Sequence, residues 1–438
     1  LIFEDPSGTA KYIETANGTV GNAPQNIQNS IQVPIKVKNT LEITQDNYQN
    51  LNTGTIFTNR FDGDVNSTII KKGVGGIQFN LNSDSLGAGQ GFFGQILIQE
   101  GAIRTINKTT FLSTVSGITV SSGGQLQLAE NSGTAVSDYN LADGAVLKLN
   151  GDGTNAIGPP PLAPVGALNF GVIVTGRTMT FHNPVELDSD STIGVEAYVP
   201  DANTIQRGVP GTEGVLDNVV SGAHSLTKYG DGKLTITNPL SGWDGDTHIL
   251  TAPTDSSSPT GAGLSVLSLS NPILADARDV YLSATRTGLD LNFTGTDTIH
   301  SFFIDSVEQA SGTWGAIGAV ALGADHETSL ITGTGWLDVT GSVSSGVDGD
   351  YNDDGKVDAA DYVIWRKNVG TSNMLPHDPT GGTIGSAQYD TWRANFGGSA
   401  PGSGAALGAA AVPEPATWLL VLFTISLFSG CKLGRMRT

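Results

Sequence analysis

The sequence predicts a mainly β protein whose first 340 residues form stacked coils, as in a β-solenoid. Three observations support this fold class. Short alternating apolar runs recur between glycines, as at residues 96–98, 118–120 and 126–128. No segment of residues 1–340 carries apolar residues at the 3.6-residue spacing of a helix. One strand–turn–strand unit also occurs twice, and because a single such unit cannot bury its own apolar face, several units must stack.

Length and composition narrow the classes of protein to which this chain can belong. The chain has 438 residues, 58 glycines and a net charge of −20. The regular apolar alternation argues against disorder, and the glycines lack the Gly-X-Y period of collagen. The negative charge disfavours nucleic acid and anionic lipid as partners of the main body. The single cysteine, Cys431, leaves no intrachain disulfide, and the lack of a signal peptide after Leu1 leads us to expect a fragment or a processed form.

The repeated unit carries apolar residues at alternate positions on either side of a glycine pair. Its two copies, at an offset of 157, are Ile69-x-Lys71-x-Gly73-x-Gly75-x-Ile77-x-Phe79 and Leu226-x-Lys228-x-Gly230-x-Gly232-x-Leu234-x-Ile236. The alternation places one face inward. We expect both glycines of each copy to supply the positive φ of a turn. Each copy then continues into a further strand, at residues 95–99 and 247–251.

These residues resemble the autotransporter-associated β-strand repeat of bacterial surface proteins. The resemblance is closest over residues 225–250 and looser over residues 67–103. It implies a right-handed parallel β-solenoid that serves as a stalk, adhesin or passenger, and it implies no active site. We assign residues 1–264 to this solenoid.

Residues 265–340 have the pattern of a β-rich capping region. The runs at 302–305, 312–315 and 331–337 predict antiparallel strands joined by turns. A solenoid needs such a cap because its last coil would otherwise leave an open strand edge. A Gly/Ser-rich linker follows at residues 341–349.

A twelve-residue loop after this linker has the ligand spacing of an EF-hand-type calcium site. Ca²⁺ prefers six to eight oxygen ligands, and loop positions 1, 3, 5, 7, 9 and 12 supply them. These positions hold Asp350, Asn352, Asp354, Lys356 through its backbone carbonyl, Asp358 and Asp361. Gly355 stands at the sharp turn, and Val357 is expected to pack inward. The alternative is an acidic, Asp/Gly-rich loop without metal.

The loop and the segment after it resemble a type I dockerin half, namely a calcium loop followed by one helix. Position 12 is Asp where EF-hands usually carry Glu, and residues 346–349 are too rich in glycine for an entering helix. An exiting helix is expected because Tyr362, Trp365 and Val369 fall on one helical face. The resemblance makes residues 350–397 a dockerin-like module and implies a protein partner, of the cohesin type or another kind.

A second half repeats the first at an offset of 27, with Tyr389 and Trp392 in place of Tyr362 and Trp365. Its six ligand positions hold His377, Pro379, Gly381, Thr383, Gly385 and Gln388. Because these positions carry no carboxylate, we expect a single Ca²⁺ site in the module. For Trp365 and Trp392 we prefer packing against the loops to stacking on a ligand.

The C-terminal end combines a short motif, an apolar run and a basic tail. After a second linker at residues 398–411, the motif is Val412, Pro413, Glu414 and Pro415. The apolar run at 419–430 predicts a transmembrane helix, although a full span needs about 20 residues. The following Lys and Arg residues place the basic end in the cytoplasm. A buried C-terminal helix is the alternative.

Residues 412–438 resemble the PEP-CTERM sorting signal of Gram-negative and planctomycete-like bacteria. The resemblance implies recognition by an exosortase, cleavage near the motif, and delivery to the cell envelope, the outer surface or the extracellular matrix. Membrane anchoring by the C-terminal helix would be transient or permanent, depending on cleavage. A lipobox-like reading of Cys431 is disfavoured because a lipobox belongs to an N-terminal signal.

No residue is assigned a catalytic role. The sequence lacks the motifs of polygalacturonases, metal-dependent hydrolases and P-loop enzymes. Asp231, Asp244 and Asp246, with His248 nearby, are the alternative acids for glycoside hydrolysis, but turn residues of this kind are more often solvated. Trp243, Trp314 and Trp336 are expected to pack at coil ends, with stacking on sugar rings as the alternative.

The sequence therefore favours a non-catalytic structural or adhesive protein of the cell envelope, with one calcium-binding loop and an exosortase-type sorting signal. Two alternatives stay open. One is a secreted polysaccharide-degrading protein that uses the dockerin-like module for assembly, and the other is a glycan-binding protein without turnover.

Overall fold

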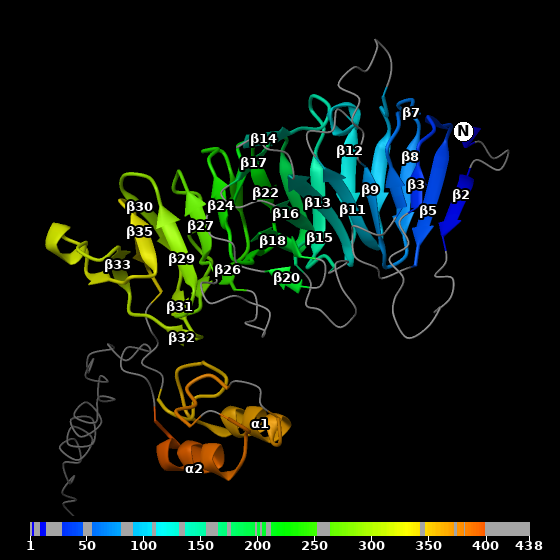
Figure 1. Ribbon diagram of the computed structural model, residues 1–438. Coiled ribbons are helices and arrows are strands. Elements are labelled where there is room, and N and C mark those ends of the chain that lie inside the picture. The colour runs from blue at the N-terminus through cyan, green and yellow to red at the C-terminus, as the bar shows by residue number, and fades with distance from the viewer. Residues whose placement is uncertain are drawn as a thin grey trace, which may run out of the picture. The chain divides into compact units, whose positions relative to one another are not determined.

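The structure is a computed structural model. The residues that it describes are 2–3, 9–14, 29–46, 55–79, 91–106, 111–130, 136–154, 165–172, 177–197, 199–201, 204–206, 212–251, 263–341, 347–371, 375–380 and 382–398. The chain divides into two compact units, residues 1–343 and residues 344–438. The first unit is mainly β, with large parallel sheets that are compatible with a β-solenoid (Figure 1).

Most strands of the first unit belong to three parallel ladders, in which each strand pairs with its counterpart in the next coil. Ladder 1 comprises β2 (Thr9–Glu14), β5 (Thr40–Gln45), β8 (Thr68–Lys72), β10 (Gln95–Ile98), β12 (Gly117–Val120), β15 (Leu147–Gly151), the first part of β18 (Val185–Ala197), β22 (Val220–Gly222) and β25 (Gly242–Trp243). Ladder 2 comprises β3 (Asn29–Ile31), β6 (Thr55–Phe57), β9 (Gly76–Phe79), β11 (Gly101–Ile106), β13 (Gly124–Glu130), β16 (Leu168–Val172), the second part of β18, β23 (Leu226–Tyr229), β26 (Thr247–Leu250), β28 (Val280–Leu282) and β31 (Phe302–Ile304).

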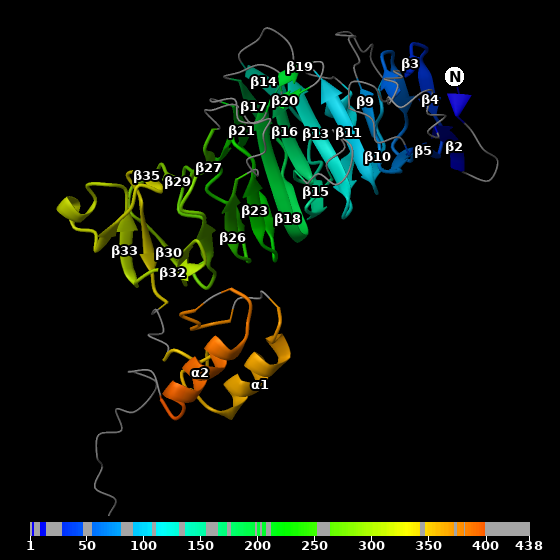
Figure 2. The same ribbon diagram turned by 60° about the horizontal axis from the view of Figure 1, so that its bottom comes forward.

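Ladder 3 forms a separate sheet in the later coils. It comprises β14 (Val136–Tyr139), β17 (Thr178–Phe181), β21 (Glu213–Leu216), β24 (Lys233–Ile236), β27 (Ser265–Leu269), β29 (Thr287–Leu291) and β35 (Ile331–Gly333). Shorter elements are β1 (Ile2–Phe3), β4 (Ile35–Val37), β7 (Phe61–Gly63), the antiparallel pair β19 (Val199–Asp201) and β20 (Thr204–Gln206), and the 3₁₀ turns η1 (Leu112–Thr114) and η2 (Val320–Leu322). The strands of consecutive coils lie side by side in both views (Figures 1 and 2).

Stacked rows of aliphatic side chains form the core. In ladder 1, one register position holds Leu41, Ile69, Ile96, Ile118, Leu147, Val185 and Val220 in successive coils. Each of these side chains is buried. The period-2 alternation of the sequence is thus confirmed, because the side chains one residue away point to the opposite face. Burying such a row removes apolar surface from water along the whole first unit.

The two copies of the repeated unit form the expected strand–turn–strand, but at different corners. The first copy joins β8 of ladder 1 to β9 of ladder 2, whereas the second joins β23 of ladder 2 to β24 of ladder 3. Gly73 and Gly230 have φ of 73° and 86°, as expected for a turn. The expectation for the second glycines was wrong, since neither has positive φ. Gly232 is needed for space, because a Cβ there would lie 2.5 Å from Val195 Cγ1.

The lysine of each repeat copy belongs to the core. Lys71 stands between Ile43 and Ile98 in a row of ladder 1, and Lys228 stands between Ile193 and Ile249 in a row of ladder 2. Lys71 Nζ donates to the carbonyls of Lys72 (2.6 Å), Gly73 (2.6 Å) and Glu100 (3.1 Å). Burial lowers the pKa of Lys71 to about 7. These ammonium groups therefore bind corner carbonyls that would otherwise be buried without a donor.

Lys228 makes the same kind of contact at its own corner. Its Nζ donates to the carbonyls of Tyr229 (3.0 Å) and Gly230 (2.7 Å) and to Ser265 Oγ (3.1 Å). In both copies two acceptors belong to the lysine's own corner and the third belongs to the following coil. The lysine of the motif is therefore a link between coils.

A row of Asp and Ser side chains closes the corner between ladders 1 and 2 in the later coils. The position just before the paired residues of ladder 2 holds, in successive coils, Asp190, Ser225, Asp246, Asp279 and Ser301. Each side-chain oxygen accepts the backbone N–H of the same position in the next coil, at 2.9, 3.2, 3.1 and 3.1 Å in that order. The row ends at Ser301, whose hydroxyl donates to Glu308 Oε1 at 2.7 Å. These polar residues satisfy backbone groups that the corner leaves outside the ladders.

The end of the first unit differs from the sequence-based expectation. Strands occur near 302, 312 and 331 as expected, but β31 and β35 run parallel to the preceding coils. Antiparallel pairing is confined to β31 with β32 (Val307–Glu308) and to β33 (Gly312–Gly315) with β36 (Trp336–Val339). β33 and β36 belong to a small four-stranded sheet together with β30 (Thr296–Ile299) and β34 (His326–Glu327). The parallel rows continue because Phe302 and Ile331 present buried apolar side chains at the core positions.

A buried carboxyl group in this small sheet predicts pH-dependent stability. Asp297 Oδ2 accepts the N–H groups of Ile273 (2.9 Å) and Leu274 (3.1 Å), and burial raises the pKa of Asp297 to about 6. Between pH 4 and pH 6 the folded state therefore holds more protons than the unfolded state, so stability falls as pH rises through this window. We expect Asp297→Asn to remove this dependence and to raise the free energy of unfolding at pH 7 by about 2 kcal/mol, with little change at pH 4.

Asp325 in the same region is the matched control. Hydrogen bonds from the Thr313 N–H and hydroxyl lower the pKa of this exposed carboxyl group. Its contribution to stability is present above the unfolded pKa and is lost as pH falls through the lower folded pKa. Asp325→Asn is thus expected to destabilise at pH 7. Urea unfolding of both variants at pH 4, 5.5 and 7 measures the two effects, and an Asp297→Asn variant that is weaker at pH 7 than at pH 4 contradicts the prediction.

Candidate calcium-binding loop

The described part of the second unit contains two helices that are related by the offset of 27 residues. Helix α1 spans Ala359–Asn368 and helix α2 spans Ser386–Asn395. The expected exiting helix is confirmed, although it ends one residue before Val369. Residues 347–349 form a turn in which Asp350 N–H donates to Val347 O at 2.9 Å, and no helix precedes the loop in the described residues. Each loop therefore has one helix, on its C-terminal side.

Position 1 of the loop is a buried carboxylate that organises the turn. Asp350 is 0% exposed, and its two oxygens accept the N–H groups of Asp354 (3.1 Å) and Gly355 (2.8 Å). Gly355 has φ of 82°, which a residue with a Cβ adopts only with strain. Val357 is fully buried, as expected. The chain thus curls around the Asp350 side chain.

Position 12 closes the loop from the first turn of α1. Asp361 is also 0% exposed, and its oxygens accept the N–H groups of Asn352 (3.0 Å) and Asp358 (2.7 Å). Asp358 in turn accepts the Ala360 N–H at 2.7 Å, which completes a capping box at the helix N-terminus. Asp361, the last ligand of the calcium pattern, is therefore fixed in place by its position in the first turn of α1.

The remaining expected ligands lie on the rim of the loop. Asn352 Nδ2 donates to Asp354 Oδ2 at 2.8 Å, and Asp354 Oδ1 accepts the Lys356 N–H at 3.0 Å. Both side chains are more exposed than Asp350 and Asp361. The expected side-chain ligands thus bind backbone N–H groups of the same loop, while Asp358 caps the helix.

The electrostatics of the loop suit a cation. Burial raises the pKa of Asp350, against the lowering effect of the Gly355 and Asp354 N–H groups, and the nearby Asp361 carboxylate raises it further. Among the described residues, no Lys or Arg side chain forms an ion pair with Asp350 or Asp361. A hard divalent cation would compensate two buried carboxylates that lack a Lys or Arg partner in the described residues, and the all-oxygen donor set fits Ca²⁺.

A contact that sequence reasoning missed brings His377 to this loop. His377 Nε2 lies 2.7 Å from Asp353 Oδ1, and ligand atoms of Asp350, Asp353 and His377 lie within 4.8 Å of one another. His377 stands at position 1 of the second loop, where the pattern signalled only a lost ligand. The structure thus offers a second grouping around Asp350, which differs from the calcium pattern in using Asp353 and His377.

The second loop closes by hydrogen bonds at the position that corresponds to Asp361. Gln388 is buried, and its Oε1 accepts the Gly385 N–H at 2.8 Å, as Asp361 accepts the N–H of Asp358. Its Nε2 donates to Asp378 Oδ2 at 3.1 Å. The Gln388 amide N–H thus binds the Asp378 carboxylate, where a carboxylate at position 12 would instead bind a metal ion. Gly381 lies outside the described residues.

The alternative acids of the first unit do not converge. Asp231 pairs with Arg286 Nη2 at 2.5 Å, Asp244 lies 3.3 Å from Arg278 Nε, and Asp246 belongs to the Asp/Ser row. β23 and β26 pair in register, so Asp246 lies before one end of this strand pair and Asp231 beyond the other. Four residues of strand separate these ends by roughly 13 Å, which exceeds the ~5–9.5 Å between the carboxyl groups of glycosidases.

The tryptophans of the first unit are packing residues. Trp243 is buried, and its indole N–H donates to Thr247 Oγ1 at 3.0 Å. Trp314 packs edge-on against Phe302 and donates to the Ala310 carbonyl. Trp336 lies close to Gly315, where a Cβ would approach the indole to 3.0 Å. Trp243 and Trp314 are therefore buried in the fold, and Trp336 is half-buried beside Gly315.

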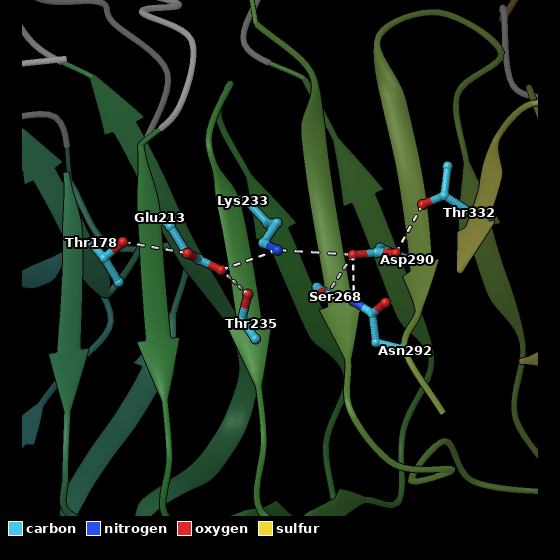
Figure 3. A network of polar contacts seen from close by, with 8 residues as sticks. All are labelled: Thr178, Glu213, Lys233, Thr235, Ser268, Asp290, Asn292 and Thr332. Carbon is cyan, nitrogen blue, oxygen red and sulfur yellow. Dashed lines mark hydrogen bonds and ion pairs between the residues drawn. The ribbon is translucent and has the colours of Figure 1, made fainter. Parts of the chain in front are cut away.

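A polar network on ladder 3 is a second feature that the sequence pattern did not indicate (Figure 3). Its members are Thr178, Glu213, Lys233, Thr235, Ser268, Asp290, Asn292 and Thr332. Lys233 Nζ lies 3.2 Å from Glu213 Oε1 and 3.9 Å from Asp290 Oδ2. The hydroxyl groups of Ser268 and Thr332 donate to Asp290 at 2.9 and 3.0 Å. Since these groups bind one another across consecutive strands, we assign the network to the linkage of coils.

The expected C-terminal features lie outside the described residues. This holds for the sorting motif Val412, Pro413, Glu414 and Pro415 and for the transmembrane helix of residues 412–438. In the described part of the chain, neither α1 nor α2 has the length and hydropathy that a membrane span requires.

Comparisons with known protein families, with curated proteins and with solved structures give no match to this chain. The function is therefore argued from the residues themselves.

Proposed function

We propose that this chain is a non-catalytic structural or adhesive protein of the bacterial cell envelope or extracellular space, and that it binds one Ca²⁺ through a dockerin-like module. The observation that carries the proposal is the loop from Asp350 to Asp361. Two buried carboxylates, at positions 1 and 12, accept backbone N–H groups of this loop, and in the described residues neither has a Lys or Arg partner. The module serves docking or rigidity, with a protein partner of the cohesin type or another kind.

The stalk part of the proposal is a right-handed parallel β-solenoid with a cap, as the likeness to autotransporter-associated repeats implies. Its support is the use of polar residues in the first unit. The core lysines, the Asp/Ser row and the ladder 3 network each join one coil to the next. Polar side chains that link coils in this way favour a long, stiff solenoid, and they are already engaged with one another rather than with a substrate.

The routing part of the proposal rests on the likeness of residues 412–438 to PEP-CTERM signals. An exosortase recognises Val412, Pro413, Glu414 and Pro415 in this proposal, and a transmembrane helix anchors the chain transiently or permanently. Partners are thus the exosortase and the membrane at the C-terminus. No nucleic acid is expected, because the net charge is −20.

A product-release experiment separates this proposal from the polysaccharide-degrading alternative. The full chain is incubated with plant, algal and bacterial polysaccharides, with and without Ca²⁺, and the supernatant is analysed by mass spectrometry. We expect no oligosaccharides, since Asp231 and Asp246 lie too far apart to act as a pair. A pectin-degrading enzyme in a parallel sample is the control. Fragments released by the chain but not by the heat-denatured chain would favour the enzymatic alternative.

A further inference from the structure

We infer that the half of the module that lost its calcium ligands positions the calcium loop of the other half, through Trp392 and the residues after α2. This inference rests on the calcium site proposed above. It is carried by two kinds of contact between the halves, each of which occurs at the calcium loop and again, at the offset of 27 residues, at the second loop.

The first pair of contacts comes from the two tryptophans. Trp392 Nε1 donates to the carbonyl of Asp358 at 2.7 Å, and Trp365 Nε1 donates to the carbonyl of Gly385 at 2.9 Å. Asp358 and Gly385 both stand at position 9 of their loops. Each helix therefore holds the loop of the opposite half, at the junction where that loop enters its own helix.

The second pair of contacts comes from the backbone after each helix. Val357 at position 8 accepts the Gly397 N–H (2.8 Å) and donates to the Gly398 carbonyl (2.9 Å). Ile384, its counterpart, accepts the Gly370 N–H (2.9 Å) and donates to the Thr371 carbonyl (2.8 Å). The calcium loop is thus held by the chain that follows α2, and the second loop by the chain that follows α1.

The two loops close through the same hydrogen bond, from the N–H at position 9 to the side chain at position 12, but they differ in charge. Gln388 binds the Gly385 N–H and Asp378 within the second loop, so this half completes its own hydrogen bonds. The calcium loop instead collects the buried carboxylates Asp350 and Asp361, whose mutual repulsion a cation relieves. The second half is therefore the part that keeps its form without metal, and the first half is the part that responds.

Aromatic packing makes the second half a firm support. Tyr362, Trp365, Tyr389 and Trp392 form an aromatic cluster, in which the centroids of contacting rings lie 5.0–6.3 Å apart. Because Trp392 is held on both sides, its indole N–H is aimed at Asp358 before metal arrives. Preorganisation of this kind lowers the ordering cost that binding would otherwise meet. Trp392 is thus a positioning residue for the calcium loop.

A matched pair of substitutions tests the inference. The full chain is stripped of metal, and Ca²⁺ binding to wild type, Trp392→Phe and Trp365→Phe is measured by titration calorimetry at low temperature. Both substitutions remove one indole N–H at equivalent places. We expect Trp392→Phe to weaken Ca²⁺ binding about tenfold and Trp365→Phe to change it less than twofold. Equal losses in the two variants, or no loss in Trp392→Phe, overturn the inference. A wild type that binds no Ca²⁺ overturns the proposed site and this inference together.

Amide hydrogen exchange on the unsubstituted chain provides a test that does not depend on the variants folding. Ca²⁺ is expected to slow exchange at the N–H groups of Gly397 and Val357, which join the calcium loop to the chain after α2. The N–H groups of Gly370 and Ile384 join the second loop and are expected to exchange at the same rate with and without Ca²⁺. Uniform protection of all four, or none at Gly397, contradicts the inference.

Discussion

Calcium titration of the metal-stripped chain is expected to show one site, which Asp350→Ala abolishes. Asp350 is buried and holds the Asp354 and Gly355 N–H groups, so its removal takes away both the first ligand and the turn that gathers the others. The second loop contributes no site, because Gln388 Nε2 meets Asp378 where the calcium pattern requires a carboxylate. Titration calorimetry counts the sites directly. Two sites of similar affinity would contradict our interpretation of the second loop.

Two neighbouring substitutions then distinguish the calcium pattern from the His377 grouping. Asp354→Asn removes the charge at loop position 5, and Asp353→Asn makes the same change one residue earlier, at a position that the pattern does not use. We expect Asp354→Asn to weaken Ca²⁺ binding at least tenfold, because ligand charge sets the affinity of such loops. Asp353→Asn is expected to leave affinity within about twofold of wild type. The reverse order would place the ion between Asp350, Asp353 and His377.

Phe79→Ala is expected to be among the most destabilising substitutions in the first unit. Phe79 is fully buried, and its ring stacks on Phe57 (5.2 Å between centroids) and Phe111 (4.4 Å) and meets Phe61 edge-on (5.4 Å). Truncation leaves a cavity among rings that belong to different coils and cannot collapse together. We expect a loss of about 3–5 kcal/mol in the free energy of unfolding.

Phe303→Ala is the matched control for this substitution. Phe303 is half-buried on the outer side of ladder 2 and stacks on Tyr281 at 4.6 Å. Its truncation opens no cavity, so we expect a loss of about 1 kcal/mol or less. Urea unfolding followed by circular dichroism compares the two variants. A similar shift for both would mean that the Phe57–Phe61–Phe79–Phe111 cluster is not a rigid part of the core.

The sequence was informative wherever local pattern decides structure. Alternation fixed which side chains of the repeat copies face inward, and the spacing from Asp350 to Asp361 located a loop that closes on a helix. The offset of 27 predicted α2 from α1. The first two features depend on residues within about a dozen positions of one another, where periodicity and turn chemistry act directly, and the third is a repeat visible in the sequence itself.

What the sequence did not reveal depends on which coils meet. The residues around Gly73 and Gly230 follow the same pattern, yet the two turns join different pairs of ladders. Which ladders a turn joins depends on the strands that precede it in the coil. The same holds for Lys233, which reaches Glu213 and Asp290 from a different strand. His377 was interpreted as a lost ligand because its contact with Asp353 spans 24 residues. Partners at such distances follow from stacking, which a single sequence does not record.

The core lysines have a consequence for how the chain finds its fold. Rows of Ile, Leu and Val are nearly interchangeable, so a newly formed coil that slipped by one strand would still bury apolar surface. Lys71 and Lys228 are not interchangeable with their neighbours, because each ammonium group needs an acceptor from the following coil, Glu100 O or Ser265 Oγ. A slipped coil would bury an amino group without that acceptor, at a cost of about 1–3 kcal/mol. The two lysines thereby destabilise intermediates in which a coil is out of register, before further coils are added.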